Sequence, residues 1–107
     1  MQRQLFTVMS KIKQQNNEKI RMSLVFHGYV QGVGFRYTAH HAALSLGLTG
    51  WVRNEYDGSV SAEIQGDRDG IEKWIRMIQG GRFIEITDID RKEKVIDPDE
   101  RSFQVRY

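Results

Sequence analysis

The segment with the clearest capacity for chemistry is a glycine-rich stretch at residues 28–36, which reads Gly-Tyr-Val-Gln-Gly-Val-Gly-Phe-Arg. Glycine tolerates positive φ angles and lets backbone N–H groups come close to a ligand, and successive N–H groups in such a turn can form a concave anion site. A helix is predicted to follow directly, so its unpaired N–H groups and the guanidinium of Arg36 would face the same place. The pattern therefore predicts a site for one phosphate-sized anion.

The residues alone leave a second interpretation open, in which the glycines only make a tight strand-to-helix turn and Arg36 is solvated. The segment does not match the common nucleotide-binding loops. A Walker loop continues with Lys and then Ser or Thr after its last glycine, whereas Phe35 and Arg36 follow Gly34. The dinucleotide fingerprint requires a further glycine where this chain has Tyr37. Nucleotide binding is therefore disfavoured.

A second segment, residues 50–60, reads Gly-Trp-Val-Arg-Asn-Glu-Tyr-Asp-Gly-Ser-Val. Three segments closely resemble the acylphosphatase family. Its two signature motifs correspond to residues 28–36 and to the second segment with its continuation to Gly66. The C-terminal Phe-Gln-Val-Arg-Tyr at 103–107 also fits the family. The resemblance extends over residues 22–107. It implies an enzyme that hydrolyses the carboxyl–phosphate bond of acyl phosphates to a carboxylate and inorganic phosphate, without a metal or another cofactor.

The resemblance also implies roles for individual residues. Arg36 would bind the substrate phosphate together with backbone N–H groups, and Asn54 would orient the attacking water. Two positions depart from the family pattern: Tyr29 stands where a basic residue is common, and Gly80-Gly81 stands where proline is usual. The positions expected to contact the phosphate are Gln31, Gly32, Val33, Gly34, Phe35 and Arg36.

The spacing of apolar residues indicates the elements that must position this site. Apolar side chains recur at helical spacing in residues 35–46 and 71–78, and strands are predicted at 22–27, 48–53, 60–65, 83–89 and 103–107. The alternation in the fourth strand slips between Ile86 and Ile89, which indicates a β-bulge. The order βαββαβ with an added C-terminal strand predicts an α+β, ferredoxin-like sandwich, in which two helices cover one face of a mixed, mostly antiparallel sheet.

Charge divides the chain into two parts. Residues 1–21 hold five basic residues and one acidic residue, a net charge of +4, whereas the whole chain carries +2, so residues 22–107 carry −2. We expect residues 1–20 to form a flexible basic N-terminal extension and residues 21–107 to form the acylphosphatase-like domain, with Met22 as a candidate alternative start. A mildly acidic domain disfavours nucleic-acid binding, which requires a basic surface.

Other features of the sequence limit the ligands and partners that the chain can bind. The chain has no cysteine, and the adjacent His40 and His41 would not share one helix face as metal ligands. No apolar run approaches the length of about 18 residues needed to span a membrane. We expect a cytoplasmic monomer that takes a small-molecule acyl phosphate as substrate, is inhibited by its product inorganic phosphate, and binds neither nucleic acid nor membrane. Two alternatives are a non-catalytic anion-binding or regulatory domain of the same fold and an RNA-binding ferredoxin-like module.

Overall fold

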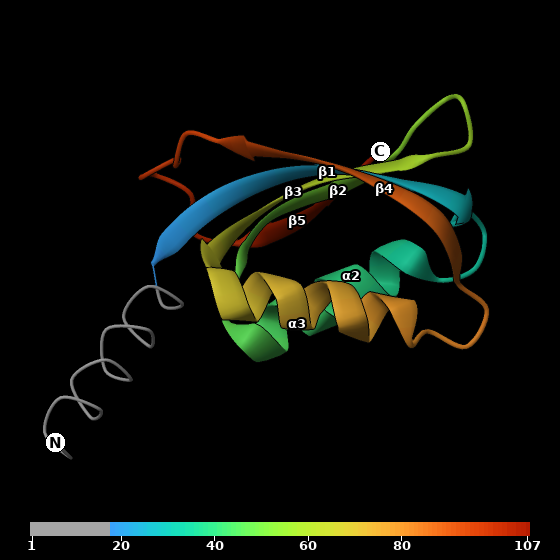
Figure 1. The fold of residues 1–107 in the computed structure, drawn as a ribbon, viewed down its shortest axis with the longest axis horizontal. Helices are drawn as coiled ribbons and strands as arrows, with labels where there is room; N and C mark the ends of the chain where they lie inside the picture. The colour runs from blue at the N-terminus through green and yellow to red at the C-terminus, as the bar shows by residue number, and fades with distance from the viewer. Residues whose placement is uncertain (1–17) are drawn as a thin grey trace, which may run out of the picture.

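Two helices lie side by side on one face of a five-stranded mixed sheet, whose strands follow the order β4-β1-β3-β2-β5 (Figure 1). The computed structural model describes residues 18–107. The element order confirms the predicted ferredoxin-like βαββαβ sandwich with an added C-terminal strand, and neither helix in these residues has the length and apolar character needed to cross a membrane. The elements are β1 (Lys19–Tyr29), α2 (Phe35–Leu46), β2 (Thr49–Asn54), β3 (Val60–Asp67), α3 (Arg68–Gln79), β4 (Glu85–Lys94) and β5 (Phe103–Arg106).

The first strand begins earlier than the apolar pattern indicated. β1 starts at Lys19, where it pairs with Asp67 of β3, and not at Met22. Ile20 packs in the core with 5% of its surface exposed, so burial as well as pairing fixes the start of the strand. Lys19 and Ile20 are therefore part of β1, and residues 1–17 of the predicted extension lie outside the described part of the chain.

The sheet topology brings three strand ends to one place. β3 pairs antiparallel with both β1 and β2, so β1 and β2 run in the same direction, and β5 pairs parallel with β2. The C-terminal ends of β1, β2 and β5 therefore lie at the same end of the sheet. These ends carry the glycine loop, Asn54 and Tyr107, and α2 starts beside them because a short loop connects it to β1.

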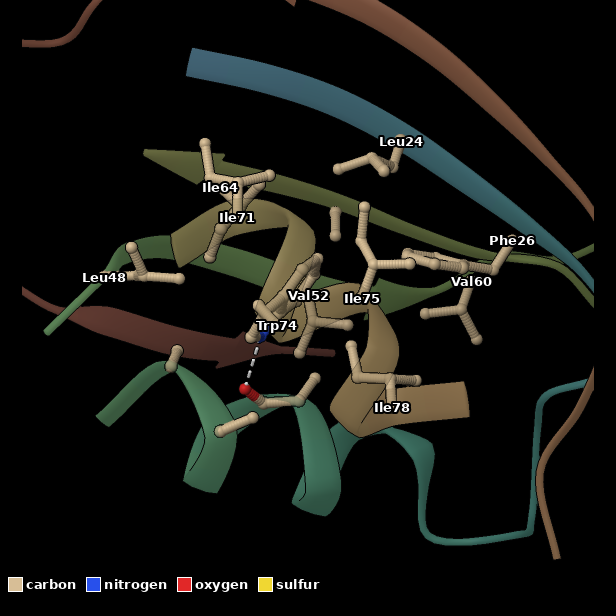
Figure 2. Packing of buried hydrophobic residues seen from close by; sticks show 14 of the residues in the cluster. Leu24, Phe26, Leu48, Val52, Val60, Ile64, Ile71, Trp74, Ile75 and Ile78 are labelled. Atoms are coloured by element: carbon tan, nitrogen blue, oxygen red, sulfur yellow. Dashed lines mark hydrogen bonds between the residues drawn. The ribbon is translucent and has the colours of Figure 1, made fainter. Parts of the chain in front are cut away.

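The core lies between the sheet and the two helices. Inward-facing residues alternate along β3, where Val60, Ala62 and Ile64 are almost fully buried. Trp74 of α3 is also buried, and its indole Nε1 donates a 2.9 Å hydrogen bond to the backbone carbonyl of Ala39 in α2 (Figure 2). This bond satisfies the polar atom of the largest core side chain and joins the two helices that cover the sheet.

Strand β4 contains the predicted β-bulge. The register between β1 and β4 shifts at Thr87, which has no partner on β1. This extra residue allows Ile86 and Ile89 both to pack against the core, although strict alternation would place them on opposite faces. The strand continues to Lys94, beyond the predicted end at Ile89, because its pairing with β1 continues to that residue.

On the face opposite the helices, the connection between β4 and β5 is fastened to the sheet by a buried polar cluster. The Arg21 cluster consists of Arg21, Glu63, Gln65 and Glu100. Arg21 Nε lies 2.7 Å from Glu63 Oε1, and its Nη1 and Nη2 lie 2.9 Å and 3.1 Å from the two carboxylate oxygens of Glu100. Gln65 exchanges two hydrogen bonds, of 2.8 Å and 2.9 Å, with the backbone of Asp97. These bonds bury both Arg21 and Gln65 on a face that strand alternation would leave exposed.

Candidate active site

The loop between β1 and α2, residues 30–34, is shaped by its glycines and anchored by its apolar residues. Gly32 and Gly34 have φ angles of 71° and 79°, in the left-handed region that favours glycine. A Cβ atom at either position would meet no atom within 4 Å, so backbone conformation and not lack of space selects glycine. Val30 and Phe35 are 1% and 2% exposed, so both ends of the loop are fixed in the core.

The first turn of α2 leaves its N–H groups without a side-chain cap. Gly34 is the N-cap residue, no side chain accepts a hydrogen bond there, and the turn has no acidic residue. Helix α3 differs, because the carboxylate of Asp67 accepts a hydrogen bond from the Gly70 N–H and Asp69 lies in the first turn. Unpaired N–H groups at the positive end of a helix dipole favour an anion, so the start of α2 can accept one from solution.

Arg36 lies in this first turn, and an aromatic ring holds its guanidinium. The Arg36 Cζ atom is 4.9 Å from the centre of the Tyr107 ring, which is a cation–π distance. None of the ion pairs within residues 18–107 includes Arg36. Its N–H groups therefore remain available for two-pronged binding of phosphate oxygens.

Asn54 is the last residue of β2, and its half-buried side chain lines the same cavity as Arg36. The turn that follows is held by other groups. Asp57 Oδ1 accepts hydrogen bonds from the Ser59 N–H at 3.0 Å and from the Ser59 hydroxyl at 2.6 Å, and the hydroxyl bond is the main cause that lowers the pKa of Asp57. The Asn54 amide makes none of the side-chain hydrogen bonds found in this hairpin, so it remains available to a water or a ligand.

An open cavity of about 340 Å³ lies where the three strand ends and the start of α2 meet. It brings Asn54 together with Arg36 and three further residues of the predicted phosphate site, Gly32, Gly34 and Phe35. None of its lining side chains carries a carboxylate that would repel an anion. The lining consists of Val30, Gly32, Gly34, Phe35, Arg36, Tyr37, His40, Asn54, Val105 and Tyr107.

The two other predicted phosphate contacts, Gln31 and Val33, do not line this cavity. The Gln31 side chain turns to the hairpin, where its Nε2 donates hydrogen bonds to the carbonyl oxygens of Glu55 and Ser59. Val33 packs against the core. Only the backbone N–H groups of these two residues are therefore left for a role in anion binding.

Sequence reasoning did not identify five residues of the cavity wall, which are Val30, Tyr37, His40, Val105 and Tyr107. The alternation of residues 103–107 indicated a strand but not its neighbour, and only the parallel pairing of β5 with β2 brings Tyr107 to Arg36. His40 is half-buried on α2, and its ring stacks on Phe103 with a distance of 6.1 Å between ring centres. Its position on the cavity side of the helix could have been inferred from helical spacing alone.

No group of three or more His, Cys, Asp or Glu side chains within residues 18–107 is placed to hold a metal ion. His27, at the end of β1, does not line the cavity either. Its Nε2 lies 2.9 Å from Asp90 Oδ2, and this hydrogen bond is the main cause that raises the pKa of His27. His27 is therefore bonded to β4 and does not belong to the cavity.

The family model of acylphosphatases matches residues 22–105. The acylphosphatase of Geobacillus thermodenitrificans is 38% identical over 88 residues, which cover 81% of this chain and 94% of that protein. The acylphosphatase of Picrophilus torridus is 43% identical over 84 residues, which cover 78% of this chain and 98% of that protein. The crystal structure of acylphosphatase from Bacillus subtilis superposes with a TM-score of 0.76 at 30% identity, over 82% of this chain and 99% of that one. With matches that cover most of both chains in sequence and in structure, this chain belongs to the acylphosphatase family.

Proposed function

We propose that this chain hydrolyses the carboxyl–phosphate bond of acyl phosphates to a carboxylate and inorganic phosphate, with Arg36 and the loop N–H groups as the phosphate site and Asn54 as the residue that orients the water. The observation that carries this proposal is the shared cavity. Around this one open space lie an arginine and an asparagine amide that have no ionic or hydrogen-bonding partner within residues 18–107, together with an uncapped helix start.

The phosphate-binding part of the proposal follows from charge and donor geometry. The guanidinium of Arg36 offers a planar pair of donors, and the loop and helix start offer backbone N–H groups with the positive end of the α2 dipole. These groups would hold the phosphoryl oxygens and stabilise the negative charge that spreads over them in the transition state. Because the groups are fixed in advance by Val30 and Phe35, little reorganisation is needed when the substrate binds.

The water-orienting part follows from the chemistry of the amide. Asn54 can donate and accept hydrogen bonds without being ionised, so it can hold a water in one orientation. The leaving group is a carboxylate, which departs without protonation by a strong general acid. A phosphate oxygen of the substrate is then the acceptor for the proton of the attacking water, so no further acid or base of the chain is required.

A second function of the same site is anion binding without catalysis, and kinetics separates the two. The purified protein should hydrolyse benzoyl phosphate, and inorganic phosphate should inhibit competitively. The activity should persist in EDTA, because the proposed mechanism uses only side chains and backbone of this chain. Binding of inorganic phosphate without hydrolysis of benzoyl phosphate would establish the non-catalytic alternative instead.

The RNA-binding alternative has less support. The central strands of such modules carry exposed aromatic residues on the open face of the sheet. Here the outward positions of β3 are Ser61, Glu63 and Gln65. Trp51 of β2 is flanked by the guanidinium groups of Arg53 and Arg106, with Cζ atoms 5.1 Å and 4.7 Å from the ring.

A further inference from the structure

Gln31 connects the glycine loop to the hairpin that follows Asn54. Its Nε2 lies 2.7 Å from the carbonyl oxygen of Glu55 and 2.8 Å from that of Ser59. Both acceptors are carbonyls, so only the NH₂ end of the amide fits between them, and both of its hydrogens are used. Within residues 18–107, these are the only side-chain hydrogen bonds between the loop at 30–34 and the turn at 55–59.

Strand pairing does not make this connection. β1 and β3 pair as far as Phe26 and Val60, and the last residues of β1 then pair only with β4. The glycine loop therefore leaves the sheet on the side of β4, whereas Asn54 ends β2 on the other side of β3. The Gln31 amide spans this separation.

The turn that Gln31 contacts is already held by hydrogen bonds within itself. The Glu55 N–H donates to the Ser59 carbonyl at 2.8 Å, the Gly58 N–H donates to the Glu55 carbonyl at 3.2 Å, and Asp57 accepts from Ser59 inside the turn. The bonds from Gln31 add a further partner to the same two carbonyls. Their effect is therefore to place the turn relative to the loop and not to form it.

We infer that Gln31 is a positioning residue, which sets the distance between the phosphate-binding loop and the water held by Asn54; this inference rests on the proposed function of both. Attack on phosphorus requires the water to lie in line with the leaving group, and a displacement of about 1 Å can reduce the rate by about 10²-fold. Gln31 does not line the cavity, so its side chain acts through the position of Asn54 and not on the substrate.

The test uses Gln31→Ala, which removes the bridge, and Gln31→Met, which keeps the length of the side chain but donates no hydrogen bond. We expect kcat for benzoyl phosphate to fall by about 10- to 100-fold in both variants, while the inhibition constant of inorganic phosphate stays close to that of the wild type. Gln79→Ala is the matched control, because Gln79 is exposed at the end of α3 and should retain full activity.

A double-mutant cycle with Asn54→Ala distinguishes positioning from general weakening of the fold. If Gln31 acts through Asn54, Asn54→Ala should reduce kcat much less in the Gln31→Ala background than in the wild type. Additive losses would overturn the inference, as would an unchanged kcat, or a loss of phosphate affinity with kcat retained. Failure of both Gln31 variants to fold would assign the residue to stability and overturn it too. A normal kcat in Asn54→Ala alone would instead contradict the proposed function of Asn54.

Discussion

Arg21 and Arg36 show two opposite uses of the same side chain. Arg21 lies on β1 with 5% of its surface exposed and is bonded to Glu63, Gln65 and Glu100. Arg36 lies on α2 at an open cavity, and the contact found for its guanidinium within residues 18–107 is the face of the Tyr107 ring. The donors of the Arg21 guanidinium are satisfied by the protein, whereas those of the Arg36 guanidinium are available to a ligand.

This difference separates a charge that is part of the folded core from one that is available to a ligand. A buried charge is tolerated only when it is paired and hydrogen-bonded, and the Glu100 hydrogen bond is the main cause that raises the pKa of Arg21. A cation at a cavity whose lining side chains carry no carboxylate attracts an anionic ligand. The two sites are also connected, because Glu100 lies in the segment that leads into β5, and Tyr107 follows β5 directly. Four substitutions test this comparison.

The largest expected effect is that of Arg36→Gln, which removes the charge and the paired donors. We expect kcat/KM to fall by about 10³-fold or more, as for other arginines that stabilise a transferred phosphoryl group. The melting temperature without phosphate should not change, and inorganic phosphate should no longer raise it. Arg82→Gln is the matched control, because the Arg82 guanidinium also lies over an aromatic ring, 5.3 Å from that of Phe83. Normal turnover in folded Arg36→Gln would show that the site is elsewhere.

Arg21→Met should have the opposite effect to Arg36→Gln, with a loss of stability and almost unchanged activity. It leaves Glu63, Glu100 and Gln65 without their buried partner, so the free energy of unfolding should fall by about 3–5 kcal/mol, as measured by urea denaturation. The kcat of the protein that remains folded should hardly change. Arg68→Met removes the exposed pair of Arg68 with Glu93 and should cost at most about 1 kcal/mol. Equal losses in the two variants would mean that the Arg21 cluster contributes no more than a surface ion pair.

Asn54→Ala should lower kcat by about 10²–10³-fold, or roughly 3–4 kcal/mol, because the proposed interaction of Asn54 with the attacking water strengthens in the transition state. KM and the melting temperature should change little. Asp57→Ala is the comparison, since Asp57 holds the same hairpin through Ser59 and should lower the melting temperature more than kcat. A lowered melting temperature with normal kcat in Asn54→Ala would make Asn54 a structural residue of the turn.

The smallest effect is expected for Tyr107→Ala, which removes the ring beside Arg36. An exposed cation–π contact contributes about 0.5–1 kcal/mol, so the inhibition constant of phosphate should rise by about two- to fivefold. Tyr107→Phe keeps the ring and should behave like the wild type. If the phenylalanine variant is as impaired as the alanine variant, the hydroxyl and not the ring is the important group.

The sequence by itself determined the parts of the protein that depend on neighbouring residues. Helical and alternating apolar spacing predicted the element order, and the slip between Ile86 and Ile89 predicted the bulge of β4, because side-chain direction follows backbone periodicity. The glycine loop with Arg36 and the segment with Asn54 were also predicted as the candidate site, since loop conformation and family motifs are properties of contiguous residues. These predictions did not require knowledge of which strands are neighbours.

Only the tertiary structure decided which distant residues meet. The parallel pairing of β5 with β2 brings Tyr107 to Arg36, the divergence of β1 from β3 gives Gln31 a gap to span, and the segment before β5 buries Arg21. No local pattern records these contacts, because strand order and register are set by the packing of the whole sheet on its helices. For the same reason, the start of β1 was recognisable only from its pairing with Asp67 and the burial of Ile20.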